Sequence, residues 1–199
     1  MPRNRTSLGI ADPYPITREV SGIDGVITDL NVTLAGVYHQ RPVDLDIMLV
    51  GPHGQKVVLM SDTCTAQAEN QTWAFDDDAY SYMGELSPCP DGRYVPNPQG
   101  EDESFPYPAR YLPVNTKTAL SDFNLTDPNG EWRLYVRDDN EFNDADGLFT
   151  QRFALDMHTR PKAKVAFAQT AVDVTEGETG KLTVTRARAP TSWERDRSE

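Results

Sequence analysis

Three pairs of aspartates are the residues of this chain whose type and spacing best suit chemistry. Each pair stands at the beginning or the end of a short apolar run. The six residues are Asp44, Asp46, Asp76, Asp77, Asp138 and Asp139. If these run ends meet in space, their mutual repulsion disfavours folding unless a cation neutralises it. Calcium suits such a site because it accepts about 6–8 oxygen ligands in loose geometry, whereas the alternative is that each aspartate caps a turn or faces water.

A second acidic segment, residues 138–147, contains the sequence Asp144-Ala-Asp-Gly147. The spacing of an EF-hand is not met, because Phe142 stands where the first ligand belongs and Phe153 where the closing glutamate belongs. We therefore expect a solvated acidic loop here rather than a calcium loop.

The cysteines and histidines do not form a catalytic motif. Cys64 and Cys89 suit neither a redox pair nor zinc. A disulfide between them would close a loop of about 25 residues and contribute about 3–4 kcal/mol, whereas a reducing cytosol would leave two free thiols. The sequence contains no Gly-x-Ser-x-Gly and no His-Glu-x-x-His, and its three histidines are expected to be polar surface residues. We expect the chain itself to be non-catalytic.

Short apolar runs separated by turn signals predict strands along most of the chain. Alternation over residues 26–34 predicts a face formed by Val26, Thr28, Leu30, Val32 and Leu34. The opposite face is formed by Ile27, Asp29, Asn31 and Thr33.

A hairpin in the middle of a sheet is predicted next, because the run 45–50 stops at Gly51-Pro-His-Gly54 and restarts at 56–60. Further strands are predicted at 72–75, 131–137 and 148–158. The spacing of the strands fits a sandwich or jelly roll.

The pattern dissolves between Tyr80 and Thr118, where prolines and single aromatics alternate. We expect a loop laid over the sheets rather than a free linker. The tyrosines of this loop that are candidates for contact with a ligand are Tyr80, Tyr82, Tyr107 and Tyr111. These side chains either cover the edge of a sheet one by one or, exposed together, stack on sugars or contact a protein partner.

Length and charge limit the remaining choices. The 199 residues carry a net charge of -12, with -14 on residues 1–158 and +2 on residues 159–199. An acidic body repels a phosphate backbone, so nucleic-acid binding is not expected. No apolar run reaches the length of a membrane span, and the basic N-terminus has no apolar stretch of a secretory signal behind it. The triplets that begin at Asn31, Asn70 and Asn124 match the weak acceptor pattern for N-glycosylation.

Five blocks in order resemble the P domain, also called P/Homo B, of the proprotein convertases and of many bacterial secreted proteins. They are residues 44–54, 56–62, 70–75, 127–132 and 147–157. The resemblance covers residues 14–158 and implies a jelly-roll β-sandwich, galactose-binding-like, that stabilises or positions a neighbouring domain, often a subtilisin-like serine endopeptidase. The insertion between Phe75 and Ala119 is longer than in the convertases.

The tail resembles the opening strands of a Calx-β domain, through Phe167 and the segments 172–177 and 182–186. We therefore expect an all-β chain with a short C-terminal β extension. The expected organisation is a disordered segment at 1–13, a sandwich at 14–159, a partial Calx-β-like segment at 160–188 and a disordered tail at 189–199.

The sequence thus favours a calcium-stabilised accessory module of a secreted or surface protein, with an adjacent domain of the same polypeptide as its partner. That neighbour is expected to be a protease in the first instance. The alternative is an adhesion module that binds a glycan or a protein.

Overall fold

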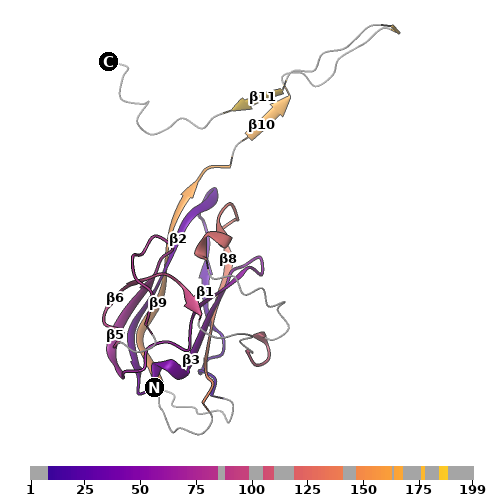
Figure 1. Cartoon of the computed structure of the whole chain (residues 1–199). Coiled ribbons are helices and arrows are strands. Elements are labelled where there is room, and N and C mark those ends of the chain that lie inside the picture. Colours follow the sequence, from indigo (N-terminus) through magenta and orange to yellow (C-terminus); the bar gives the residue numbers. More distant parts are fainter. Residues whose placement is uncertain are drawn as a thin grey trace. The chain divides into compact units, whose positions relative to one another are not determined.

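The computed structural model describes residues 9–84, 88–98, 105–109, 119–140, 147–162, 164–167, 176–177 and 184–187 (Figure 1). The chain divides into two compact units, Met1–Thr159 and Arg160–Glu199. In the second unit, β10 (Lys164–Phe167) pairs antiparallel with β11 (Val184–Ala187). Within the described residues, no helix is long and apolar enough to cross a membrane.

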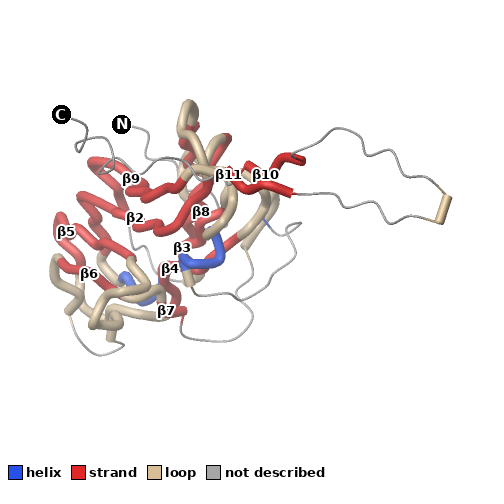
Figure 2. The backbone as a smooth tube through the Cα atoms, turned by 90° about the horizontal axis from the view of Figure 1, so that it is seen from above, coloured by secondary structure: helices blue, strands red, loops and turns tan. Residues whose placement is uncertain are grey.

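The first unit consists of two β-sheets that lie in two layers (Figure 2). The five-stranded sheet has the order β1 (Ile16–Val20), β8 (Gly130–Asp138), β3 (Leu45–Val50), β4 (Lys56–Ser61) and β7 (Asn97–Pro98). The four-stranded sheet has the order β6 (Gly92–Tyr94), β5 (Ala68–Phe75), β2 (Val26–His39) and β9 (Gly147–Arg160). The predicted all-β, jelly-roll sandwich is confirmed.

The central hairpin is confirmed as well. β3 is antiparallel to both β4 and β8, and all six of its side chains are buried. The Gly51 amide donates to the Gln55 carbonyl at 2.8 Å, and Gly54 adopts a positive φ of 86°, which costs a residue without Cβ little. A strand covered on both faces reads as a continuous apolar run, which is why 45–50 lacks alternation.

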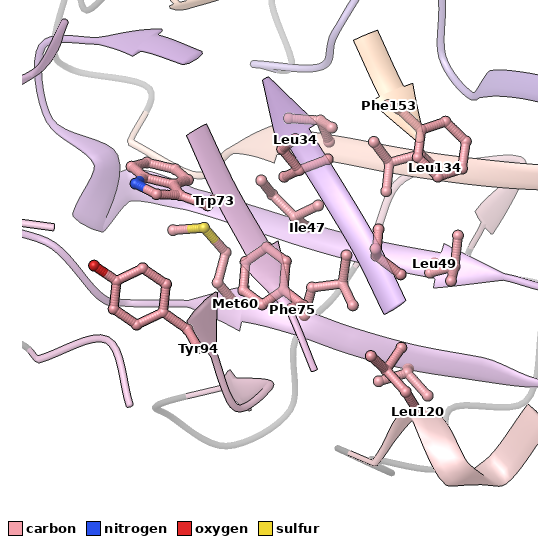
Figure 3. Close-up of a cluster of buried hydrophobic side chains, with 14 of the residues drawn as sticks. Leu34, Ile47, Leu49, Met60, Trp73, Phe75, Tyr94, Leu120, Leu134 and Phe153 are labelled. Carbon is pink, nitrogen blue, oxygen red and sulfur yellow. The ribbon is translucent and has the colours of Figure 1, made fainter. Parts of the chain in front are cut away.

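The core lies between the sheets, and both contribute to it (Figure 3). The four-stranded sheet contributes Leu34, Trp73, Phe75, Tyr94 and Phe153, and the five-stranded sheet contributes Ile47, Leu49, Met60 and Leu134. Two buried tryptophans also need a hydrogen-bond partner for the indole N–H. The Nε1–H of Trp73 donates to the Cys89 carbonyl at 3.1 Å, and that of Trp132 donates to the Pro128 carbonyl at 2.9 Å.

The predicted faces of β2 are right from Leu30 onward and wrong before it. Ile27 is fully buried, whereas Thr28 is exposed and donates its hydroxyl to the His158 carbonyl. At this end, Ile27 exchanges backbone hydrogen bonds with the loop before β8, donating to Thr126 at 2.9 Å and accepting from Leu125 at 2.8 Å. Alternation alone predicted neither this pairing nor the burial of Ile27.

The segment without a sequence pattern contains two short strands that were not predicted. β6 pairs parallel with β5 at the edge of one sheet, and β7 pairs parallel with β4 at the edge of the other. Two residues, Val95 and Pro96, separate them. The segment therefore crosses from one sheet to the other and closes that side of the sandwich.

A disulfide between Cys64 and Cys89 fastens the same side, with the two Cα atoms 5.6 Å apart. Cys64 follows β4 of one sheet, and Cys89 precedes β6 of the other. The opposite side is closed by Arg18 of the edge strand β1, whose guanidinium donates to the Phe153 carbonyl of the edge strand β9 at 2.9 Å.

A smaller apolar cluster covers the outer face of the five-stranded sheet. Its members are Met48, Val50, Val58, Phe105, Ala109 and Tyr135, with Tyr14 packed against them. Lys56 pairs with Val50 in the β3–β4 register and is 8% exposed, and within the described residues its Nζ has no hydrogen-bond partner. Burial lowers the pKa of the Lys56 ammonium for this reason.

The predicted disorder of residues 1–13 is wrong for its last part. The Ala11 amide donates to the Val136 carbonyl at 3.1 Å, and Ile10 bridges to Arg137. Ala11 also packs against the core. Residues 1–8 and 189–199 lie outside the described residues, as do 172–174 of the Calx-β-like tail.

Replacing both cysteines by serine should lower the free energy of unfolding by about 3 kcal/mol, because the loop of 25 residues is no longer closed in the unfolded chain. Urea unfolding followed by tryptophan fluorescence measures this difference. Dithiothreitol should destabilise the wild type by a similar amount and leave the double variant unchanged. Equal stability of the two proteins would show that the crossing segment closes this side without the disulfide.

Candidate functional site

Four of the six candidate aspartates lie at one end of the β3–β8 pair. We call Asp44, Asp46, Asp138 and Asp139 the aspartate rim. The register sets Leu45 opposite Asp138 and Asp46 opposite Arg137, and the Asp139 amide donates to the Asp44 carbonyl at 2.9 Å. Asp44 ends the short 3-10 helix η1 (Pro42–Asp44), so the strand alternation that was expected to align it with Asp46 does not reach it.

Arginine side chains lie beside two of the rim carboxylates, and a histidine ring contacts a third. The Arg41 Nε lies 3.1 Å from Asp44 Oδ2, and one Arg137 guanidinium nitrogen lies 3.7 Å from Asp46 Oδ2. The His39 Nε2 lies 3.3 Å from Asp138 Oδ2. Asp44 and Asp46 are almost fully buried, and a buried carboxylate requires such a partner.

Among the described residues, Asp139 is the member of the rim whose carboxylate has no such ion pair. Burial raises the pKa of the Asp139 carboxyl, the nearby Arg137 lowers it, and the negative charges of Asp62, Asp44 and Asp138 raise it further. The folded protein therefore binds a proton at Asp139 more tightly than the unfolded chain does.

The remaining pair, Asp76 and Asp77, directly follows the end of β5, where both carboxylates have protein partners. Asp76 forms an ion pair with Arg93 of β6 and accepts the amide of Asp78 at 2.8 Å. The two carboxylate oxygens of Asp77 accept the Leu120 and Ser121 amides at 2.8 Å each. Asp77 thus caps the first turn of η3 (Leu120–Phe123), where unpaired amides favour a negative charge.

The expected convergence of all six aspartates is wrong. The Ala68 end of β5 pairs with His39, which contacts the rim, whereas Asp76 follows the Phe75 end. A strand rises about 3.3 Å per residue, so the two sets are separated by roughly 20 Å along β5. Antiparallel pairing brings the start of β3 next to the end of β8. The end of β5 that carries Asp76 and Asp77 lies at the opposite end of the sandwich.

The described residues do not fit the predicted six-aspartate calcium site. Within the described parts of the chain, no group of three or more His, Cys, Asp or Glu side chains is placed to hold a metal ion. The acidic loop with Asp144 lies outside the described residues. Calcium binding by the chain stays a prediction, without a site among the described aspartates.

His39 was expected at the surface as a loop residue and is instead 3% exposed at the end of β2. Its Nδ1 accepts the Arg41 amide at 3.2 Å, and its Nε2 faces Asp138. Because both ring nitrogens are engaged by the protein, this histidine and aspartate pair links β2 to β8 and has no ring nitrogen left for a substrate.

Sequence reasoning missed His39 and Lys56, and one signal was available for the first. Gly36 lies in β2 where the register with β5 shifts, between Ala35 and Val37. A glycine inside a strand often marks a bulge, and a bulge changes which residues face inward. Lys56 had no signal, since the sequence does not show what covers the outer face of a sheet.

The exposed tyrosines also differ from the expectation that each covers a sheet edge. Tyr80, Tyr82 and Tyr107 are exposed, whereas Tyr94 and Phe105 of the same segment are buried. The backbone of Tyr82 bridges to Val95 next to β6, so Tyr80 and Tyr82 lie on the side of the sandwich that the crossing segment closes. Tyr111 lies outside the described residues.

The fold defines the first unit as a β-sandwich module. No protein-family description matches the chain, and no curated protein matches it. Among solved structures, the chain is similar to part of the crystal structure of the Aeromonas sobria serine protease (ASP) and chaperone (ORF2) complex, with 17% identity and a TM-score of 0.31. The match covers 91% of this chain and 24% of that chain. A likeness of this size carries no argument about activity or partners.

Replacing Asp77 by alanine should lower the free energy of unfolding by about 1–2 kcal/mol, because the amides of Leu120 and Ser121 lose their acceptor. Asp78→Ala is the matched control, since its side chain is exposed, and it should change stability by less than about 0.5 kcal/mol. Urea denaturation of both variants measures the difference. Equal effects would contradict the capping role.

Replacing Asp139 by asparagine should stabilise the protein at pH 7 and not at low pH. The raised pKa means that ionised Asp139 costs stability above its folded pKa, and the cost disappears below the unfolded pKa of about 4. Water screens this exposed group, so the gain should stay below about 1 kcal/mol. Melting temperatures from pH 3.5 to pH 7.5 test this, and a variant that melts lower than the wild type at pH 7 would contradict it.

Proposed function

We propose that this chain is a non-catalytic accessory module of a secreted or surface protein, in which the sandwich stabilises or positions an adjacent domain of the same polypeptide. The observation that carries the proposal is the way the sandwich ends. Its closing strand β9 ends at Arg160, and strand β10 of the second compact unit begins at Lys164, so three residues join them. A sandwich built in series with another β unit is typical of a module in a multidomain chain.

The resemblance to the P domain supports a more specific form of this proposal. All five resembling blocks fall on sandwich strands or the turns between them: β3 with its turn, β4, β5, the turn into β8, and β9. The adjacent domain is therefore proposed to be a subtilisin-like serine endopeptidase, and the tail to be the start of a Calx-β-like domain. The proposal includes no calcium ion, because the described residues contain no group of three or more His, Cys, Asp or Glu side chains placed to hold one.

The disulfide supports the extracellular placement. Structural disulfides persist in oxidising compartments and are rare in a reducing cytosol. The Cys64–Cys89 bridge joins the ends of segments that belong to different sheets, which is a structural position.

A second candidate function, adhesion to a glycan or protein, is favoured by one observation. Tyr80 and Tyr82 expose their rings on the crossing side, and exposed tyrosines offer an apolar face with a polar end. The accessory role does not use these two side chains.

The parent polypeptide with its adjacent domain tests the proposal through two variants. Trp132→Ala should weaken the sandwich core by about 3–5 kcal/mol and thereby lower the melting temperature and secreted yield of the adjacent domain. The control Tyr80→Ala/Tyr82→Ala should change neither. If the neighbour is a protease, casein hydrolysis should decay faster on heating in the Trp132 variant alone.

An adjacent domain that melts identically in all three proteins would contradict the accessory role. If the wild type then binds a glycan array and the tyrosine variant does not, adhesion takes its place. Labelling of the isolated chain by a fluorophosphonate probe would contradict the non-catalytic assignment.

A further inference from the structure

Asn70 is set apart from its strand by an irregularity in the β2–β5 pairing. Val37 pairs with Gln71 and Tyr38 pairs with Glu69, so Asn70 has no partner in the ladder. Its φ is 63°, a left-handed conformation that asparagine tolerates better than most residues. Such a bulge turns the extra residue out of the sheet, and the Asn70 side chain is exposed.

Asn70 also begins the triplet Asn70-Gln-Thr72, the acceptor pattern for N-linked glycans. The triplets at Asn31 and Asn124 differ from it in their environment. The Asn31 amide donates to Asp29 at 3.3 Å within β2, and the side-chain oxygens of Asn31 and Asn124 are buried with no hydrogen-bond partner among the described residues. The side chains of Asn31 and Asn124 are therefore partly buried, whereas that of Asn70 is exposed and accessible to a transferred sugar.

The edge of the four-stranded sheet is open beside this bulge. β6 pairs with β5 at residues Trp73–Phe75, and in the described part of the chain no strand pairs with Ala68–Thr72 on that side. Asp91 covers the end of this gap by accepting the Thr72 amide at 2.8 Å. An open edge can pair with a strand of another molecule, and a bulky hydrophilic group at Asn70 would prevent that.

We propose that Asn70 is an N-glycan attachment site whose glycan shields the open half of the β5 edge. In the transfer, a bond forms between Asn70 Nδ2 and C1 of the first sugar of a lipid-linked oligosaccharide. The bond from C1 to the lipid pyrophosphate oxygen breaks, the pyrophosphate leaves with its electron pair, and the amide loses one proton. The proposal rests on the extracellular placement proposed above.

The full chain behind a cleavable secretory leader, produced in yeast, tests the proposal. All proteins carry Asn4→Gln, because Asn4-Arg-Thr6 matches the same pattern and lies outside the described residues. Glycosidase release in heavy-oxygen water and peptide mass spectrometry give the occupancy at each asparagine. We expect most of the secreted chain to be modified at Asn70 and less than a tenth of it at Asn31 or Asn124.

Matched variants separate the glycan from effects on folding. Thr72→Ala should abolish the modification and Thr72→Ser should keep it, while Asn31→Gln and Asn124→Gln should leave it unchanged. Removal of the glycan from the folded wild type should increase its self-association in sedimentation velocity. An unmodified Asn70 in secreted, disulfide-bonded protein, or a glycan on Asn31 or Asn124 instead, would overturn the proposal. Since the host supplies the secretory route, that failure would leave the extracellular placement standing.

Discussion

The burial of a large aromatic and aliphatic core between two sheets is the constraint on which the rest of this structure depends. A sandwich of this kind has two open sides where the edge strands of the sheets face each other. Here the side with β6 and β7 is closed by a crossing segment and by the Cys64–Cys89 disulfide, and the side with β1 and β9 by Arg18. The indole of Trp73 connects the core to the disulfide on this side, since its N–H donates to the Cys89 carbonyl.

The charged residues are arranged around the same constraint. Asp77 caps η3, Asp76 joins β5 to β6, and the aspartate rim joins η1, β3 and β8 with the help of arginine and histidine. Asp46, Asp76, Asp77 and Asp138 each contact a neighbouring element through their carboxylates, whereas ionised Asp139 retains a cost that asparagine would remove. In the described part of the chain, these aspartates connect elements rather than form one metal site.

The proposed accessory role and the proposed glycan site rest on two features outside the core, the end of β9 and the edge of β5. The sandwich is complete in itself and passes directly into a second β unit, which suits a module that holds its position beside a neighbour. Where β6 stops short, half of β5 keeps an open edge, and the Asn70 bulge lies there. The exposed Tyr80 and Tyr82 lie next to the crossing segment and are not part of the core.

The sequence by itself determined the all-β class, the hairpin around Gly51–Gly54 and the inward faces of β8 and of most of β2, because alternation and turn residues are local properties. It did not determine which strand ends meet. Asp46 and Asp139 came together and Asp77 went to the far pole because strand order and direction set those distances. Tertiary contacts also account for the burial of Ile27 and of His39, which lies beyond the Gly36 bulge. They account as well for β6 and β7, which form in a segment whose sequence has no strand pattern. These outcomes depend on partners distant in the chain, whose positions only the packing of the two sheets decides.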